Sequence, residues 1–83
     1  MKILYFAWVR ERVGTAEEEL DLPQHVATPG DLIGWLKTRG PEFEAAFERP
    51  EIIRVALDQV HVEQDEPLGN PREVALFPPM TGG

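Results

Sequence analysis

The residues of this sequence best suited to chemistry are its last two, Gly82 and Gly83. Glycine lacks a Cβ atom, so such an end can enter a channel too narrow for other residues and can adopt backbone angles that they resist. What this end offers chemically is the α-carboxylate of Gly83. A carboxylate is a poor acyl donor until a partner adenylates it with ATP, after which a sulfur nucleophile gives a thiocarboxylate and an amine gives an amide.

Two prolines separate this end from the rest of the chain. Pro78 and Pro79 lack the backbone N–H groups that a sheet needs and favour extended backbone, so we expect the last strand to stop before them. Met80 to Gly83 can then project by about 13 Å, at ~3.3–3.6 Å per residue. The sequence therefore predicts a domain over residues 1–79 and a flexible carrier tail over 80–83. A glycine pair placed after a strand and two prolines favours a functional role over chance.

The other side chains do not predict a second reactive site. The chain has no cysteine, so it cannot use a thiolate. His25 and His61 stand far apart, without the further ligands that a zinc site requires. Asp65 and Glu66 precede a proline, which is typical of a turn rather than of an acid–base pair. We find no glycine-rich phosphate loop and no Ser-His-Asp set, and we therefore expect no bound cofactor and no metal.

The small size and the acidic charge narrow the classes of function. In 83 residues, 15 acidic and 8 basic side chains give a net charge of −7. One domain of this length has little room for a deep active site, which favours a binding module or a carrier over a self-contained enzyme. The negative field disfavours nucleic acid and anionic membranes as partners and favours basic protein surfaces. The apolar segments are too short to span a membrane, and we expect a soluble, cytoplasmic protein.

Strands are predicted near both ends of the sequence. The first runs from Lys2 to Ala7 or Trp8 and is apolar on both faces: Ile3, Tyr5 and Ala7 on one, and Leu4, Phe6 and Trp8 on the other. The last covers residues 73–77, with Val74 and Leu76 on one face and Ala75 and Phe77 on the other. Strands apolar on both faces lie inside a sheet. Because helices can cover only one face of so small a sheet, the other face predicts a protein interface.

Helices dominate the first half of the intervening sequence. Residues 9–13 predict a helical turn capped by Gly14, and residues 17–22 a strand with its leucines turned inward. Thr28 and Asp31 begin a helix with a capping box, and this helix extends to Arg39. A second helical piece carries an apolar stripe at Phe43, Ala46 and Phe47 and ends at Pro50.

Two more strands, over residues 52–57 and 60–62, precede a turn at 68–71. In the first of them, Ile53, Val55 and Leu57 share one face. The predicted fold is therefore α+β, a mixed sheet with helices on one face. If the terminal strands lie side by side at its centre, the topology is the ubiquitin-like β-grasp.

Three segments resemble the small, sulfur-carrier subunit of molybdopterin synthase. They are Leu4-Tyr5-Phe6-Ala7 with Val9-Arg10-Glu11, then Val55-Ala56-Leu57-Asp58-Gln59, and finally Glu73-Val74-Ala75-Leu76-Phe77-Pro78-Pro79-Met80-Thr81-Gly82-Gly83. The resemblance spans the chain in length and order of elements; the C-terminal block is specific, and residues 17–49 match only in character. It implies the β-grasp fold and the carriage of sulfur to a cyclic pyranopterin precursor, which builds the dithiolene of molybdopterin for the molybdenum cofactor.

The resemblance also implies partners and residue roles. A ubiquitin-activating-like adenylyltransferase would use ATP to adenylate Gly83, and a sulfur donor enzyme would convert the adenylate to a thiocarboxylate. The tail would then insert into the large subunit of the synthase, which supplies the catalytic side chains and binds the pterin, in a complex with two copies of each subunit. By this resemblance Gly83 bears sulfur, Gly82 gives clearance, Met80 and Thr81 line the channel mouth, and Phe77, Pro78 and Pro79 lie at the interface.

Two departures from the family pattern lie near turns. Asp58 stands where the family often has asparagine, and Pro71-Arg72-Glu73 stands where the family often has an acidic Gly-Asp-Glu turn. Both departures affect local hydrogen bonding more than the function of the tail.

Two other functions remain open. One is a sulfur carrier for thiamine thiazole or for tRNA thiolation, although thiazole carriers are typically shorter, with fewer helical residues than the 28–49 segment here. The other is a ubiquitin-like binding module whose tail is never activated.

Overall fold

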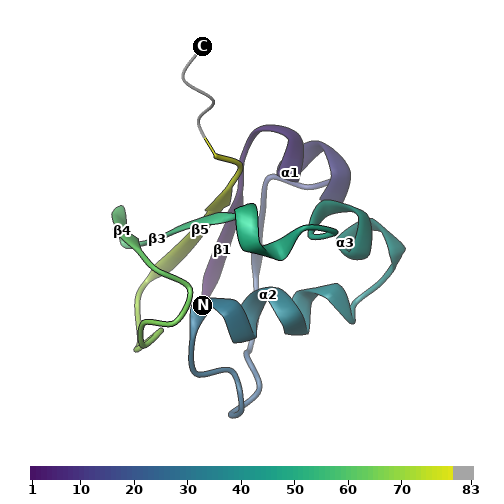
Figure 1. Cartoon of the computed structure of the whole chain (residues 1–83). Helices are drawn as coiled ribbons and strands as arrows, with labels where there is room; N and C mark the ends of the chain where they lie inside the picture. The colour runs from purple at the N-terminus through teal and green to yellow at the C-terminus, as the bar shows by residue number, and fades with distance from the viewer. Residues whose placement is uncertain (80–83) are drawn as a thin grey trace.

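A computed structural model describes residues 1–79 of the chain (Figure 1). Its elements are, in order, β1 (Lys2–Tyr5), α1 (Ala7–Val13), β2 (Glu17–Glu19), α2 (Pro29–Lys37), α3 (Pro41–Ala46), the 3₁₀ turn η1 (Pro50–Ile52), β3 (Arg54–Leu57), β4 (Val60–Val62) and β5 (Glu73–Phe77). The strands form one sheet in the order β2-β1-β5-β3-β4. This mixed sheet with its helices is the predicted α+β, ubiquitin-like β-grasp fold.

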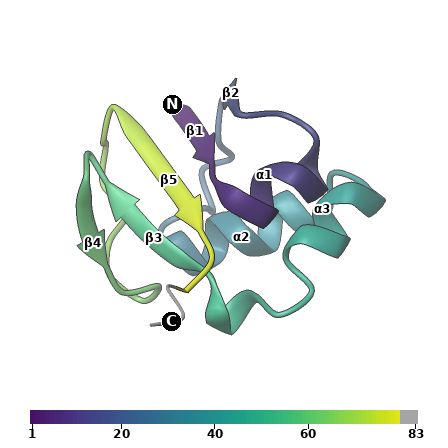
Figure 2. The ribbon, with the colours of Figure 1, turned by 90° about the horizontal axis from the view of Figure 1, so that it is seen from above.

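The first and last strands lie side by side at the centre of this sheet (Figure 2). They run parallel, with Ile3 opposite Val74 and Tyr5 opposite Leu76. All four of these side chains point into the core and are at most 1% exposed. On its other edge β5 pairs antiparallel with β3. The C-terminal strand is therefore held by hydrogen bonds along both edges.

All three α-helices pack on one face of the sheet (Figure 2). The capping box predicted for α2 is present: Thr28 Oγ1 accepts from the Asp31 N–H at 3.1 Å, and the Asp31 carboxylate accepts from the Thr28 N–H at 3.1 Å. This arrangement satisfies backbone groups that a helix start leaves unpaired. The helical residues buried against the sheet are Val9, Val13, Leu32, Ile33, Leu36, Phe43 and Ala46, with Phe47 just after α3.

The prediction that the first strand continues to Ala7 or Trp8 is wrong. β1 ends at Tyr5, and Ala7 and Trp8 belong to α1. The chain turns at Ala7, whose φ of 53° lies in the left-handed region. An alternating apolar run this short fits a strand or a buried helix equally well, so the pattern could not locate the turn.

Other element ends also differ from the prediction. β2 stops at Glu19 rather than at residue 22, although Leu20 and Leu22 are half-buried against the core, as expected of inward side chains. α2 ends at Lys37 rather than at Arg39. β3 begins at Arg54 because Pro50 starts the 3₁₀ turn that takes up Ile52. The cap at Gly14, with a φ of 94°, and the bounds of β4 and β5 agree with the sequence.

Glu18 connects the edge strand β2 to the core and to the end of the helical segment. Its carboxylate accepts a hydrogen bond from the Tyr5 hydroxyl at 2.7 Å and two from the Arg39 guanidinium at 2.8 and 3.2 Å. The guanidinium also lies 4.7 Å from the centre of the Phe43 ring. Burial alone would raise the pKa of the Glu18 carboxyl, but the hydrogen bonds from Arg39 and Tyr5 outweigh it and hold this pKa below its usual value. Burial, with the bond to Glu18, raises the pKa of Tyr5.

The β3–β4 hairpin turns through two residues with positive φ, Asp58 at 47° and Gln59 at 71°. Two such residues in a two-residue loop form the type I′ turn, which favours Asn-Gly or Asp-Gly. The Asp58 carboxylate accepts from the backbone N–H groups of Arg72 and Glu73 at 2.9 and 3.0 Å. The Asp58 carboxylate thus connects the β3–β4 turn to the segment that enters β5.

Replacing Glu18 by glutamine should reduce stability at neutral pH but not in acid. Because the pKa of Glu18 is lowered on folding, its ionised form stabilises the protein above its ordinary value of 4.5, and this contribution is lost as the pH falls through the lower, folded-state value. We expect Glu18→Gln to cost ~1–3 kcal/mol at pH 7, as for hydrogen bonds to a charged group. Urea unfolding at pH 7 and pH 3 measures the difference; Glu19→Gln is the exposed control. An equal loss at both pH values would contradict this assignment.

Replacing Gln59 by glycine should stabilise the hairpin. Glycine adopts positive φ without the strain that a side chain brings, which is worth on the order of 1 kcal/mol. We expect the midpoint of thermal unfolding to rise by a few degrees. Gln24→Gly, at an exposed position without positive φ, is the matched control and should not stabilise. A Gln59→Gly variant no more stable than the wild type would show that the turn is not strained.

Candidate functional site

The central strand β5 leads directly into the predicted carrier segment. Phe77 is its last residue and pairs with Arg54 of β3. Pairing stops there, as the two prolines predict, and Pro78 and Pro79 follow half-buried. The remaining residues with predicted roles, Met80, Thr81, Gly82 and Gly83, lie outside the described part of the chain.

The face of the sheet turned away from the helices carries apolar side chains. The strand register places Leu4, Ala75, Ala56 and His61 in one row across β1, β5, β3 and β4. Phe77 lies on this face because it is two residues beyond Ala75 in β5. Phe6 continues the alternation of β1 on the same side: its backbone is extended, and its N–H donates to the Leu76 carbonyl at 3.1 Å. We call these six residues, Leu4, Phe6, Ala56, His61, Ala75 and Phe77, the open face.

Two aromatic residues lie at the end of the open face from which the chain leaves the sheet. Phe6 is 46% exposed, an unusual exposure for a large apolar side chain. Phe77 is half-buried, and its ring meets the His61 ring edge-on, with centroids 5.2 Å apart. By contrast, Val74 and Leu76 of the same strand are fully buried on the helix side. Exposed apolar patches occur at protein-binding sites, so this end of the open face is the candidate docking surface.

Charged side chains border the open face. Lys2 on β1 forms an ion pair with Glu17 on β2 at 3.1 Å. Glu73 lies at the start of β5, and Arg54 lies beside Phe77. An apolar centre with a charged border is the usual composition of a protein–protein interface.

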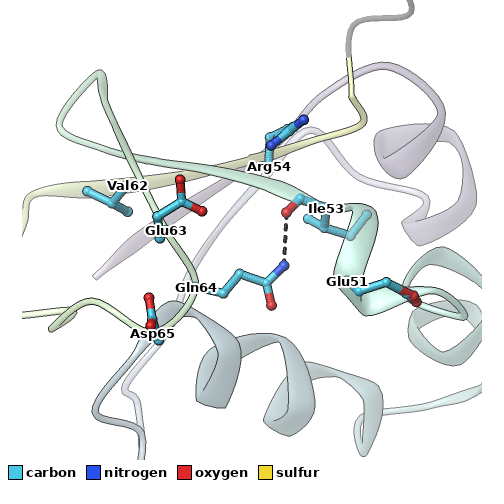
Figure 3. Close-up of a pocket in the computed structure, with 7 residues that line it drawn as sticks. All are labelled: Glu51, Ile53, Arg54, Val62, Glu63, Gln64 and Asp65. Carbon is cyan, nitrogen blue, oxygen red and sulfur yellow. Dashed lines mark hydrogen bonds between the residues drawn. The ribbon is translucent and has the colours of Figure 1, made fainter.

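The hollow between β3, β4 and η1 is a structural feature rather than a second site (Figure 3). The amide of Gln64 crosses it, donating to the backbone carbonyls of Pro50 and Ile53 at 2.7 and 2.9 Å. Its acidic residues, Glu51, Glu63 and Asp65, come from separate segments. Within residues 1–79 no group of three His, Asp or Glu side chains is arranged to hold a metal ion. No helix in this part of the chain is long and apolar enough to cross a membrane.

The structure gathers at one end of the sheet several of the residues that the sequence predicts to bind a partner, and it adds His61 to that face. Phe77, Pro78 and Pro79 lie at one end of the sheet beside Phe6, which alternation had placed on the same side as Leu4. The sequence predicts His61 to be a surface or structural histidine rather than a zinc ligand, but it does not predict its place on the open face. The two-residue turn at 58–59 could have revealed it, because that turn fixes the β3–β4 register and sets His61 opposite Ala56.

Comparisons with known proteins extend over the whole chain. The family model of the ThiS family matches residues 3–83. The molybdopterin synthase sulfur carrier subunit of Escherichia coli is 37% identical over 91 residues, covering 100% of this chain and 99% of that protein. The protein of the same name from Dictyostelium discoideum is 33% identical over 82 residues, covering 99% of this chain and 94% of that protein. A solved structure described as a molybdopterin converting factor, subunit 1, from Pyrococcus furiosus superposes with a TM-score of 0.71 and 31% identity, covering 94% of each chain.

Replacing a side chain by alanine should lower the free energy of unfolding more on one face of the sheet than on the other. Leu76 is fully buried, so Leu76→Ala should lower the free energy of unfolding by ~2–5 kcal/mol. Phe6→Ala, at the neighbouring position on the open face, should cost less than about 1 kcal/mol, because its side chain already meets water. Urea unfolding of both variants measures the difference. Equal losses would mean that Phe6 belongs to the core and that the open face is not a free surface.

Proposed function

Because the chain belongs to the ThiS family, we propose that it is the sulfur-carrier subunit of a molybdopterin synthase. The observation that carries the proposal is the full-length similarity to sulfur carrier subunits, on a fold whose central strand leads directly into Pro78-Pro79 and the final glycines. The open face next to that strand supports it, since a partner that receives the tail must sit beside Phe77.

The proposed chemistry takes place at the carboxylate of Gly83. One of its oxygens attacks the α-phosphorus of ATP, and pyrophosphate leaves. The persulfide of a donor enzyme then attacks the acyl carbon and AMP leaves. A second thiol of the donor cleaves the resulting acyl disulfide, which leaves a thiocarboxylate on the carrier and a disulfide on the donor. The sulfur passes to the pyranopterin precursor, and water supplies the oxygen that restores the carboxylate. Gly82 and Gly83 suit these steps because they give enzymes access from every side.

The domain itself contributes docking rather than catalysis in this proposal. A ubiquitin-activating-like adenylyltransferase binds ATP and forms the adenylate, so the carrier needs no cofactor of its own. The large subunit of the synthase binds the precursor and supplies the catalytic side chains, in a complex with two copies of each subunit. Both partners must reach the tail, and we place the open face, Pro78 and Pro79 at the contact. Met80 and Thr81 then lie in the mouth of the channel that admits the tail.

Removing Gly83 should abolish carrier activity without affecting the fold. We expect the intact chain, incubated with the adenylyltransferase, ATP and the sulfur donor, to gain the mass difference between oxygen and sulfur. A chain lacking Gly83 should gain nothing, because its end falls one residue short of the position where the carboxylate reacts. Intact-mass spectrometry measures the gain, and thermal unfolding should be unchanged, since the last strand already ends at Phe77.

Two results would contradict the proposal. If the intact chain gained no sulfur, every carrier function would be excluded in favour of a binding module. If it gained sulfur but the complex with the large subunit failed to convert the pyranopterin precursor, a carrier for thiamine thiazole or tRNA thiolation would replace the present proposal.

A further inference from the structure

His61 introduces a titratable side chain into the open face. It lies in the middle of β4, opposite Ala56, and its imidazole contacts the Phe77 ring edge-on at a 70° interplanar angle. The side chain is exposed on the isolated chain. Histidine is the side chain that ordinarily changes charge between pH 5 and 8.

The charged groups around His61 are few. Within the sheet, Arg54 of β3 lies on the same face as His61, opposite Phe77. Glu63 follows β4, and both Glu63 and Arg54 line the hollow shown in Figure 3. Glu73, at the other end of β5, lies two residues before Ala75 on this face. Lys2 and Glu17 form an ion pair with each other on the far side of β5. The helices pack on the opposite face of the sheet.

The place of Phe77 indicates what covers His61 in a complex. The last strand ends at Phe77 and the sequence of the predicted tail follows Pro78 and Pro79, so a protein that encloses the tail must lie over the end of β5. The Phe77 ring is in contact with the His61 ring, and a surface that covers one therefore removes the other from water. Removing an imidazolium from water costs more than removing a neutral imidazole. The positive charge of Arg54 on the same face adds to that cost, and the negative charge of Glu63, two residues beyond His61, offsets part of it.

We propose that the large subunit packs an apolar surface onto His61 and Phe77 and accepts only the neutral imidazole, so that acid weakens the complex. This inference rests on the proposed function and deepens it by naming the chemistry of the partner's surface. A partner that instead presented a carboxylate to His61 would bind more tightly in acid.

The dissociation constant of the full chain with the large subunit, measured at pH 7.5 and pH 5.5, tests the proposal. Release of one proton on binding changes this constant by at most tenfold per pH unit, and we expect the wild-type complex to weaken about tenfold over the range. His61→Leu and His61→Gln should remove this loss, leaving only the pH dependence of the partner. His25→Gln is the matched control: His25 lies exposed between β2 and α2, away from the open face, and its variant should keep the wild-type loss.

Four results would overturn the inference. The complexes of the two His61 variants could weaken in acid as much as the wild-type complex, which would place the titrating group elsewhere. The wild-type complex could tighten in acid, which would show a carboxylate opposite the ring. Its affinity could also be independent of pH. If no complex formed at any pH, while the sulfur-loaded chain was made normally, the proposed large subunit would be wrong as well as the surface assigned to it.

Discussion

The parallel pairing of β1 with β5 is the constraint on which the rest of the structure depends. It aligns Ile3 with Val74 and Tyr5 with Leu76, and the four side chains form the floor on which the helices pack. The pairing joins residues from the two ends of the sequence, so forming it carries the entropy cost of closing a loop of nearly the whole length. It also fixes β5 at the centre, where hydrogen bonds along both edges determine the point from which the last residues leave.

The two faces of the central strands have different roles. In β5, Val74 and Leu76 stabilise the domain while Ala75 and Phe77 remain at the surface, and Tyr5 and Phe6 divide in the same way at the end of β1. The strands thus present apolar side chains opposite the core, on the face that we propose as the docking surface. The Glu18 carboxylate stabilises the edge of the sheet, because its hydrogen bonds from Tyr5 and Arg39 hold β2 against β1.

The sequence predicted the fold well because its strongest signals are local. The capping box at Thr28, the cap at Gly14 and the prolines after Phe77 each specify one conformation, and the structure has all of them. The ends of β1 and β3 could not be predicted because they depend on where the sheet offers a partner: Ala7 turns away into α1, and Ile52 goes into the 3₁₀ turn. The open face was predicted from alternation in the terminal strands, whereas His61 needed the β3–β4 register. The roles assigned to residues 80–83 remain predictions.

Labelling the chain purified from its own cells with a thiol-reactive alkylating agent tests the central claim most directly. Because the sequence contains no cysteine, a thiocarboxylate would be the only strongly nucleophilic sulfur in the protein. We expect a fraction of the chain to carry one alkyl group, located by fragmentation at Gly83. A chain that stays entirely unlabelled in cells making molybdenum cofactor, or that is labelled elsewhere, would contradict the carriage of sulfur at this residue.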